Sequence, residues 1–129
     1  MSIPVELDAL EAATADYGYA YLLTVTDGER PKIVAVHPEW SDHRMVIASG
    51  GGTARNAEAR SQVSLAFPPA DPEGYTLIVD GLARVATDGE ATIISIAPSS
   101  AVLHRPAPAG FVNTATGCSH DCAPVDSQS

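Results

Sequence analysis

The feature of the sequence that most constrains its fold is a succession of short apolar runs separated by turn residues. Runs of this length at close spacing are typical of antiparallel strands, and tight turns such as Asp80-Gly81 fit between them. They predict a mainly β fold of six or seven strands, a barrel or sandwich rather than a parallel sheet. The expected strands, rich in Val, Ile, Leu, Ala and Thr, are 19–26, 32–36, 44–49, 62–67, 75–79, 82–87 and 90–97. Several are apolar on both faces, so a closed barrel would bury one side and a partner subunit the other.

Helices and a tail complete the expected organisation. Residues 4–17 read as a helix, with Pro4 in its first turn and Gly18 as its stop. A short helix is expected at 54–60, directly after the third strand, with Thr53 as its N-cap. We also expect a short helical stretch at 99–105. One domain would then span residues 1–105, followed at 106–129 by a tail rich in Pro, Gly, Ala, Thr and Ser that is loop or partly disordered.

The charge of the chain excludes two classes of partner. The net charge is −9, and Lys32 is the single lysine. Nucleic acids and anionic membranes bind proteins largely through basic side chains, so neither is expected as a main partner. No apolar stretch approaches the ~20 residues that cross a bilayer, and the acidic start lacks the pattern of a signal peptide. We expect a cytoplasmic protein, in which Cys118 and Cys122 are thiols more often than a disulfide.

The segment SGGGTARNAEAR, residues 49–60, is the strongest candidate for a ligand site. A helix N-terminus offers unpaired N–H groups and partial positive charge, and neighbouring glycines let an anion approach the backbone. Arg55 and Asn56 lie in the first turns of the expected helix, Arg60 follows, and Ser49 and Thr53 add hydroxyls. The segment matches neither the Walker pattern nor GxGxxG. Local chemistry alone leaves a phosphate site and an ordinary turn both open.

The order of these elements resembles the pyridoxamine 5'-phosphate oxidase-like family, also called the flavin-binding split barrel. The resemblance rests on AYLLTVTDGERPKIVAVHPEW, then RMVIASGGGTARNAEARSQVSLAF, then GYTLIVDGLARV. It covers about residues 7–105 and lies in the order and spacing of the motifs rather than in any single one. It implies an antiparallel split β-barrel with an N-terminal helix and a short helix after the third strand.

The resemblance also implies a function. It implies a homodimer that binds FMN, or the deazaflavin coenzyme of many bacterial relatives, in a groove between subunits. Hydride transfer by the flavin ring would make the protein an oxidoreductase acting on a small organic substrate. Pro38 and Trp40 would lie near the edge of the isoalloxazine ring. The residues that would contact the cofactor phosphate are Ser49, Gly50, Thr53, Arg55 and Asn56. The chain departs from the family at Thr53, where members that hold the phosphate well often carry Lys or Arg.

No side chain is an obvious general acid or base, so the catalytic residues stay unknown. Tyr75 or His37 could donate a proton, although packing or simple exposure is the commoner role for a histidine like His37. Trp40 fits a core position at the barrel edge as well as contact with a cofactor ring. His43 lies in a turn and is expected to be solvated.

The sequence leaves two alternatives to a flavin protein open. A haem- or tetrapyrrole-binding module, or a cofactor-free barrel, would keep the fold without the redox chemistry, and the cation missing at Thr53 favours it. Cys118, His120 and Cys122, with His104 upstream, could form a zinc site, but their spacing is not a standard one. A thiol pair or no site at all are the other possibilities for these residues.

Overall fold

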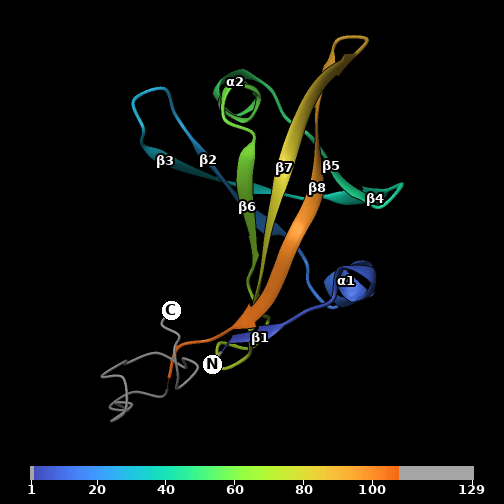
Figure 1. The fold of residues 1–129 in the computed structure, drawn as a ribbon, viewed down its shortest axis with the longest axis vertical. Coiled ribbons are helices and arrows are strands. Elements are labelled where there is room, and N and C mark those ends of the chain that lie inside the picture. Colours follow the sequence, from blue (N-terminus) through green and yellow to red (C-terminus); the bar gives the residue numbers. More distant parts are fainter. Residues whose placement is uncertain (1, 108–129) are drawn as a thin grey trace.

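The computed structural model describes residues 2–107, which fold into one antiparallel sheet and two helices (Figure 1). In these residues the sheet has eight strands in the order β3-β2-β6-β7-β8-β5-β4, and β1 pairs with β8 off this path. The predicted mainly β fold class is confirmed. The elements are β1 (Ser2–Pro4), α1 (Leu7–Thr14), β2 (Ala20–Val25), β3 (Pro31–Val36), β4 (Glu39–Ser41), β5 (Arg44–Ala48), α2 (Gly51–Ala59), β6 (Gln62–Phe67), β7 (Thr76–Asp88) and β8 (Ala91–His104).

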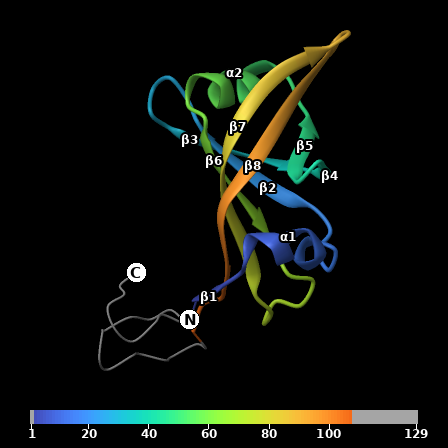
Figure 2. The same cartoon turned by 45° about the vertical axis from the view of Figure 1, so that its right-hand side comes forward.

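The sheet curls so that its buried side chains share one interior. Figures 1 and 2 show β2 and β3 crossing behind the long β7 and β8, with α1 and α2 at different ends of the sheet. The strands alternate in burial, as in β2, where Leu22 and Thr24 are buried while Tyr21 and Leu23 are exposed. This period of two places one row of apolar side chains inside. The largest buried apolar side chains are Leu10, Leu22, Met45, Leu65, Leu77, Val79, Ile94 and Ile96.

Two of the predicted helices are wrong in part or in full. The helix predicted at 4–17 begins only at Leu7, and the stretch 99–104 is not helical. The first helix is α1, Leu7–Thr14, and Pro4 belongs instead to β1, where it pairs with Val102 of β8. Proline has no N–H to donate, and a short strand tolerates it. Residues 99–104 are part of β8 rather than a helix, because pairing with β1 and β7 on both sides outweighs the weak local preference for helix.

The predicted turn at Asp80-Gly81 is also wrong, because β7 runs through it. The register with β8 shifts there, so that Gly81 lies opposite Pro98 and Asp80 opposite Ser100. A Cβ on Gly81 would lie 2.7 Å from the carbonyl oxygen of Ala97. The glycine is therefore needed for a close backbone approach at a β-bulge, and the bulge accommodates Pro98 in a strand interior.

Two local features were missed or misplaced by sequence reasoning. Trp40 lies in the three-residue strand β4, which was not expected, and β4 turns into β5 through Asp42 and His43 with φ of 51° and 64°. His43 is exposed, as predicted. The second helix begins at Gly51 with Gly50 as its N-cap, so the prediction of Thr53 as N-cap is wrong. Thr53 is buried within the first turn.

Some of the expectations fall on the tail. Cys118, His120 and Cys122 lie outside the described residues, as does most of the tail predicted at 106–129. Within residues 2–107, neither helix has the length and apolar character needed to cross a bilayer.

Candidate functional site

The junction between β5 and α2 leaves the first turn of the helix without a side-chain cap. The amide of Ser49 donates to the carbonyl oxygen of Thr92 at 3.0 Å, which ties the end of β5 to β8. Gly51 then takes φ of 60°, a left-handed conformation that glycine adopts at little cost. The N-cap Gly50 provides no side-chain hydrogen bond. The N–H groups of the first helical turn have no intrahelical acceptor, so they stay available to a ligand at the positive end of the helix dipole.

Two cationic side chains meet at this turn. A Cβ built on Gly52 would lie 3.1 Å from Lys32 Nζ and 3.8 Å from Arg55 Nη2. Lys32 comes from β3, and Arg55 lies on the exposed side of α2. No carboxylate of the described residues forms a salt bridge with either group. Because glycine has no side chain, space remains at Gly52 where two positive charges approach a helix N-terminus. This arrangement suits a phosphate or another anion.

Lys32 is the residue of this cluster that sequence reasoning missed. The sequence did set Lys32 apart, because it is the single lysine of an acidic chain and begins the strand predicted at 32–36. Nothing local to Lys32 indicates that its ammonium reaches the α2 turn, 20 positions away in the sequence. The pairing of β2 with β3 and the packing of α2 on β2 bring them together.

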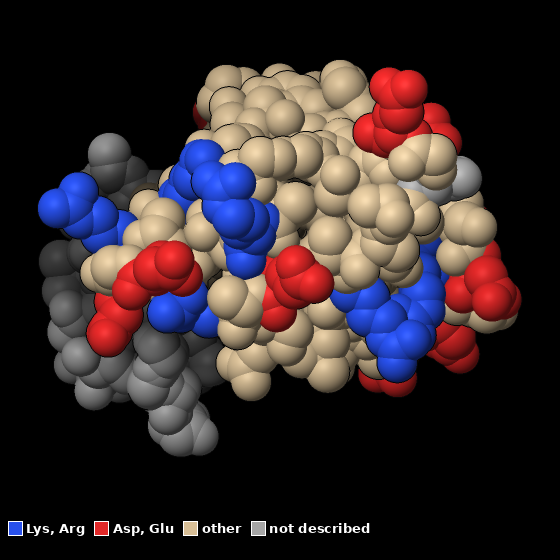
Figure 3. All heavy atoms as spheres, turned by 90° about the horizontal axis from the view of Figure 1, so that it is seen from above, with Lys and Arg blue, Asp and Glu red and all other residues tan. Residues whose placement is uncertain are grey.

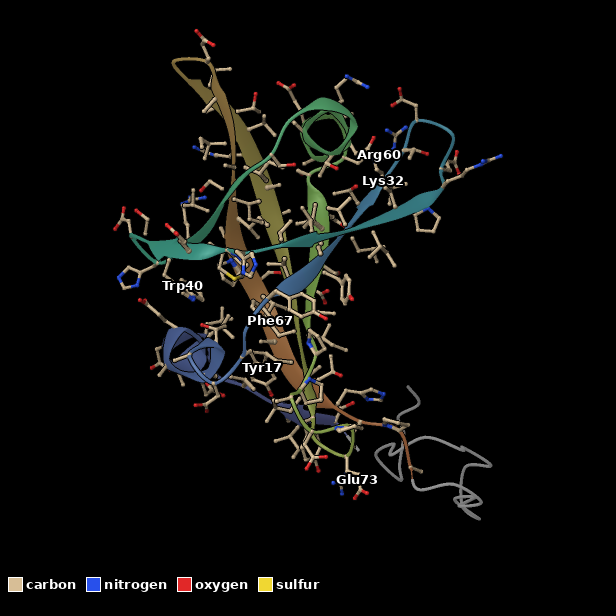
Figure 4. The ribbon with its side chains drawn as sticks, turned by 180° about the vertical axis from the view of Figure 1, so that it is seen from behind. Tyr17, Lys32, Trp40, Arg60, Phe67 and Glu73 are labelled. Atoms are coloured by element: carbon tan, nitrogen blue, oxygen red, sulfur yellow. The ribbon has the colours of Figure 1, made fainter. Side chains whose placement is uncertain are left out.

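Arg60, the other base noted in the segment, has a different role. Its Nη1 lies 3.0 Å from Oδ1 of Asp27 in the turn between β2 and β3. The carboxylate is 95% exposed, so the pair contributes little to the stability of the fold. It does connect the end of α2 to the hairpin that carries Lys32. Figure 4 labels Lys32 and Arg60, which both lie at the end of the molecule that carries α2.

Thr53 and Asn56 face inward rather than toward solvent. They are 5% and 7% exposed, and Asn56 Nδ2 donates to Thr24 Oγ1 at 3.2 Å. Residues three and four apart share one side of a helix, and here that side packs on β2 and β7. Of the residues predicted to contact a phosphate, Gly50 and Arg55 are therefore exposed at the turn, while Thr53 and Asn56 hold the helix on the sheet.

A depression runs from Arg55 to the hairpin of β7 and β8. Its volume is about 500 Å³, and Glu58 adds one carboxylate to it. Figure 3 looks onto this end of the molecule and shows groups of basic side chains interspersed with acidic ones on a mostly uncharged surface. The lining residues are Gly51, Ala54, Arg55, Glu58, Val85, Ala86, Thr87 and Thr92.

Pro38 and Trp40 lie at another place in the fold. Trp40 Nε1 donates to Thr14 Oγ1 at 2.8 Å, which fixes the indole on α1. Both residues line a cavity of about 300 Å³ beside α1, whereas Arg55 lines the depression beside α2. Within one chain the structure does not bring Pro38 and Trp40 into the same cavity as the α2 turn. Figures 1 and 2 show α1 and α2 at different ends of the sheet.

Neither Tyr75 nor His37, the two possible proton donors, lies at the candidate phosphate site. The ring of Tyr75 lies under the guanidinium of Arg105, with 4.6 Å between Cζ and the ring centroid. His37 is exposed, with its ring 6.5 Å from that of Tyr19. A hydrogen bond with Tyr21 is the main cause that raises the pKa of Tyr19. None of these groups lies in the depression beside α2.

The outer face of β2, β3 and β6 carries exposed apolar side chains. Ile33 is 63% exposed, and with Tyr21 and Leu23 it lines a shallow cavity of about 300 Å³. A second depression, of about 640 Å³, continues across β7, where Leu82 is 50% exposed. Grouped exposed apolar side chains are typical of protein–protein interfaces. It matches the sequence observation that these strands are apolar on both faces.

No metal site is found in residues 2–107, where no three His, Cys, Asp or Glu side chains are grouped suitably. Nδ1 of His104, named above as a possible fourth zinc ligand, lies 3.2 Å from Ser2 Oγ.

Comparison with known proteins supports the fold and gives close relatives without a known activity. No family model matches the chain. An uncharacterized protein of Mycobacterium tuberculosis is 40% identical over an alignment of 131 residues that covers 92% of each chain. An uncharacterized protein of Mycobacterium bovis has the same identity and coverage.

Solved structures with this fold have names that refer to different activities and ligands. A pyridoxamine 5'-phosphate oxidase, described as putative, from Listeria innocua superposes with a TM-score of 0.65 and 15% identity, over 75% of this chain and 96% of the other. An F420 reductase gives 0.61 and 18%, over 70% and 94%. The haem storage protein of Vibrio cholerae gives 0.57 and 14%, over 74% and 91%. At these identities the likeness shows the split-barrel fold alone.

Proposed function

Given that the chain belongs to the same family as the uncharacterized mycobacterial proteins and has the split-barrel fold, we propose that it binds a flavin or deazaflavin cofactor as an oxidoreductase. The phosphate of the cofactor is held at the first turn of α2. FMN is the first candidate and the deazaflavin coenzyme the second, since both carry a phosphate on the chain attached to the ring.

One observation carries this proposal: Lys32 Nζ and Arg55 Nη2 converge on Gly52 at an uncapped helix N-terminus. The basic residue that relatives often have three positions before Asn56 is Thr53 here, and Thr53 is buried. Lys32 offers the missing positive charge from β3. The donors available at the turn are two cations and backbone N–H groups, and this set fits a phosphate dianion.

The chain binds and orients the cofactor, which itself supplies hydride transfer to or from a small organic substrate. Arg55 offers a fork of N–H donors and Lys32 a point charge, so together they fix the position of the phosphate. Asn56 acts indirectly, because its bond to Thr24 holds α2 in place. No proton donor is assigned.

The proposal includes a second copy of the chain on the outer face of β2, β3 and β6. Ile33, Leu23 and Tyr21 are exposed together on this face, and a grouped apolar patch, unlike a single exposed side chain, is typical of an interface. Leu82 is exposed beside it on β7. A homodimer would cover them and would form a groove between subunits near the α2 turn.

Titration with FMN and with riboflavin tests the phosphate site. Riboflavin has the same ring without the phosphate, so the ratio of the two affinities isolates the α2 turn. We expect FMN or the deazaflavin to bind with a Kd below ~100 μM, and Lys32→Ala and Arg55→Ala each to weaken it about fivefold to tenfold. Arg84→Ala, an exposed arginine outside the depression, is the matched control.

The absorption spectrum of the freshly purified protein distinguishes the rival cofactors. Bands near 370 and 450 nm indicate flavin, and one near 400 nm indicates haem or a deazaflavin, which mass spectrometry of the released cofactor separates. Bound haem, or no binding of either flavin below ~100 μM, would refute the proposal.

A further inference from the structure

A cavity between α1 and the β3–β4 connection lies away from the α2 turn. Its volume is about 300 Å³, and three aromatic side chains contribute to its wall. The rings of Tyr17 and Phe67 are 6.1 Å apart at 63°, an edge-to-face contact. Figure 4 shows these two residues and Trp40 on the side of the sheet where α1 lies. The lining residues are Glu11, Thr14, Ala15, Tyr17, Gly18, Pro38, Trp40 and Phe67.

The polar groups on the aromatic rings are already used within the protein. Tyr17 Oη donates to the carbonyl oxygen of Tyr75 at 2.9 Å, and Trp40 Nε1 donates to Thr14 Oγ1 at 2.8 Å. Thr14 Oγ1 in turn donates to the carbonyl oxygen of Glu11 at 2.8 Å. These three donors are therefore engaged, and a ligand meets aromatic surface rather than hydrogen-bond donors from these side chains.

The charge around the cavity is negative. Glu11 is the one lining residue that is charged at neutral pH. Residues 1–18 contain four acids, Glu6, Asp8, Glu11 and Asp16, and no lysine or arginine. Burial is the larger cause that raises the pKa of Tyr17, and the carboxylate of Asp16 is the second. An anion such as the cofactor phosphate is disfavoured here.

We propose that this cavity binds a small organic cation, such as a quaternary or protonated amine, between the rings of Tyr17, Trp40 and Phe67 and the carboxylate of Glu11. Aromatic faces attract cations through the ring quadrupole. A quaternary ammonium is weakly hydrated, so it loses little hydration energy on entering a cavity with apolar walls. The volume accommodates an ammonium with a few methyl groups. Within one chain this cavity is separate from the proposed phosphate site, because the two groups of residues line different depressions.

Trp40 makes the test direct, because it is the single tryptophan of the chain. Choline is titrated into the full-length protein while tryptophan fluorescence is followed, and the same titration is made with the neutral analogue in which carbon replaces the quaternary nitrogen. We expect a saturable change with choline at a Kd of ~1–10 mM, and at least about fivefold weaker binding of the neutral analogue.

Variants separate the cavity from the net charge of the protein. Glu11→Gln should weaken choline binding about fivefold, whereas Glu73→Gln, on the loop before β7, should leave it unchanged. Phe67→Leu removes one ring and keeps an apolar side chain, and it should also weaken binding. Circular dichroism confirms that each variant is folded. Equal binding of choline and its neutral analogue, no saturable change up to ~50 mM, or an unaffected Glu11→Gln would overturn the proposal.

Discussion

Asn56 on α2 donates a hydrogen bond to Thr24 on β2 across 3.2 Å, and both side chains are buried. The bond joins the helix beside the candidate phosphate site to the strand next to Lys32. A residue that the family resemblance assigns to the cofactor thus has a structural partner in this chain.

Replacing Asn56 should therefore change stability more than a replacement at the neighbouring surface. Asn56→Ala leaves the Thr24 hydroxyl without its donor in a buried position, and we expect a loss of about 1–3 kcal/mol in the free energy of unfolding. Arg55→Ala should change it by less than ~0.5 kcal/mol, because that side chain is exposed. Urea denaturation measures both. An Asn56→Ala protein of unaltered stability would contradict the structural role.

Filling the space at Gly52 should separate binding from folding. In Gly52→Ala the new methyl group lies 3.1 Å from Lys32 Nζ, so the ammonium must move from the turn. Alanine favours helix by up to ~1 kcal/mol, so stability should stay equal or rise, while FMN affinity falls about fivefold. Riboflavin serves as the control ligand and should bind as before. Equal FMN affinity of variant and wild type would argue against the α2 turn as the phosphate site.

Gly81 should tolerate no side chain. A Cβ there would lie 2.7 Å from the Ala97 carbonyl oxygen and from Ile96 Cγ2, and a backbone atom cannot move aside cheaply. We expect Gly81→Ala to cost roughly 3 kcal/mol. Gly28→Ala is the matched control, because its Cβ would find the nearest atom, Thr26 Oγ1, at 3.9 Å. Thermal or urea denaturation compares the two, and similar small losses would show that the bulge can relax.

Charge on the outer face should prevent dimer formation. Leu82→Asp and Ile33→Asp place a carboxylate on the apolar surface proposed to contact a second copy, where burial of a charge is costly. We expect the wild type to have twice the chain mass in light scattering and both variants to have the chain mass. Leu7→Asp changes a similarly exposed leucine on α1 and should leave the dimer intact. A monomeric wild type would remove the dimer from the proposal.

The ionisation of Tyr17 should reduce stability at high pH. Burial and then Asp16 raise the pKa of Tyr17 above 10.0. Because the folded-state pKa is the higher one, the protonated phenol stabilises the fold fully below the unfolded-state pKa, and this contribution is lost as pH rises through the folded-state value. Tyr17→Phe should flatten the decline of unfolding free energy between neutral pH and about pH 11. The difference in tyrosinate absorbance between the two proteins gives the Tyr17 midpoint, which should exceed 10.0.

Sequence patterns gave the strands well where apolar runs were bounded by clear turns and failed where the turn signals were misleading. The Asp-Gly pair at 80–81 looks like a hairpin turn, yet the chain continues because Gly81 meets the backbone of β8. The stretch 99–104 favours helix locally, but its backbone pairs with β1 and β7 as part of β8. Both errors come from contacts with segments that local pattern does not reveal.

The candidate site shows the same division. The glycine turn, Arg55 and the presence of a short helix could be predicted from the sequence, since turn chemistry is local. The start of that helix could not, because it begins at Gly51 rather than at Ala54. That Asn56 points inward followed only from the packing of α2 on β2. The exposed apolar face was foreseen because strands 19–26 and 32–36 are apolar at consecutive positions.

By itself, the sequence determined the mainly β architecture, the acidic composition and the glycine-rich turn before α2, because alternation, charge and turn propensity are encoded in neighbouring residues. Only the tertiary structure decided that Lys32 reaches Gly52 and that Trp40 binds Thr14 on α1. Those contacts join residues 20 and 26 positions apart, and strand register and helix packing set them. Local sequence specifies the apolar alternation and the turns, whereas strand pairing and helix packing specify which side chains meet.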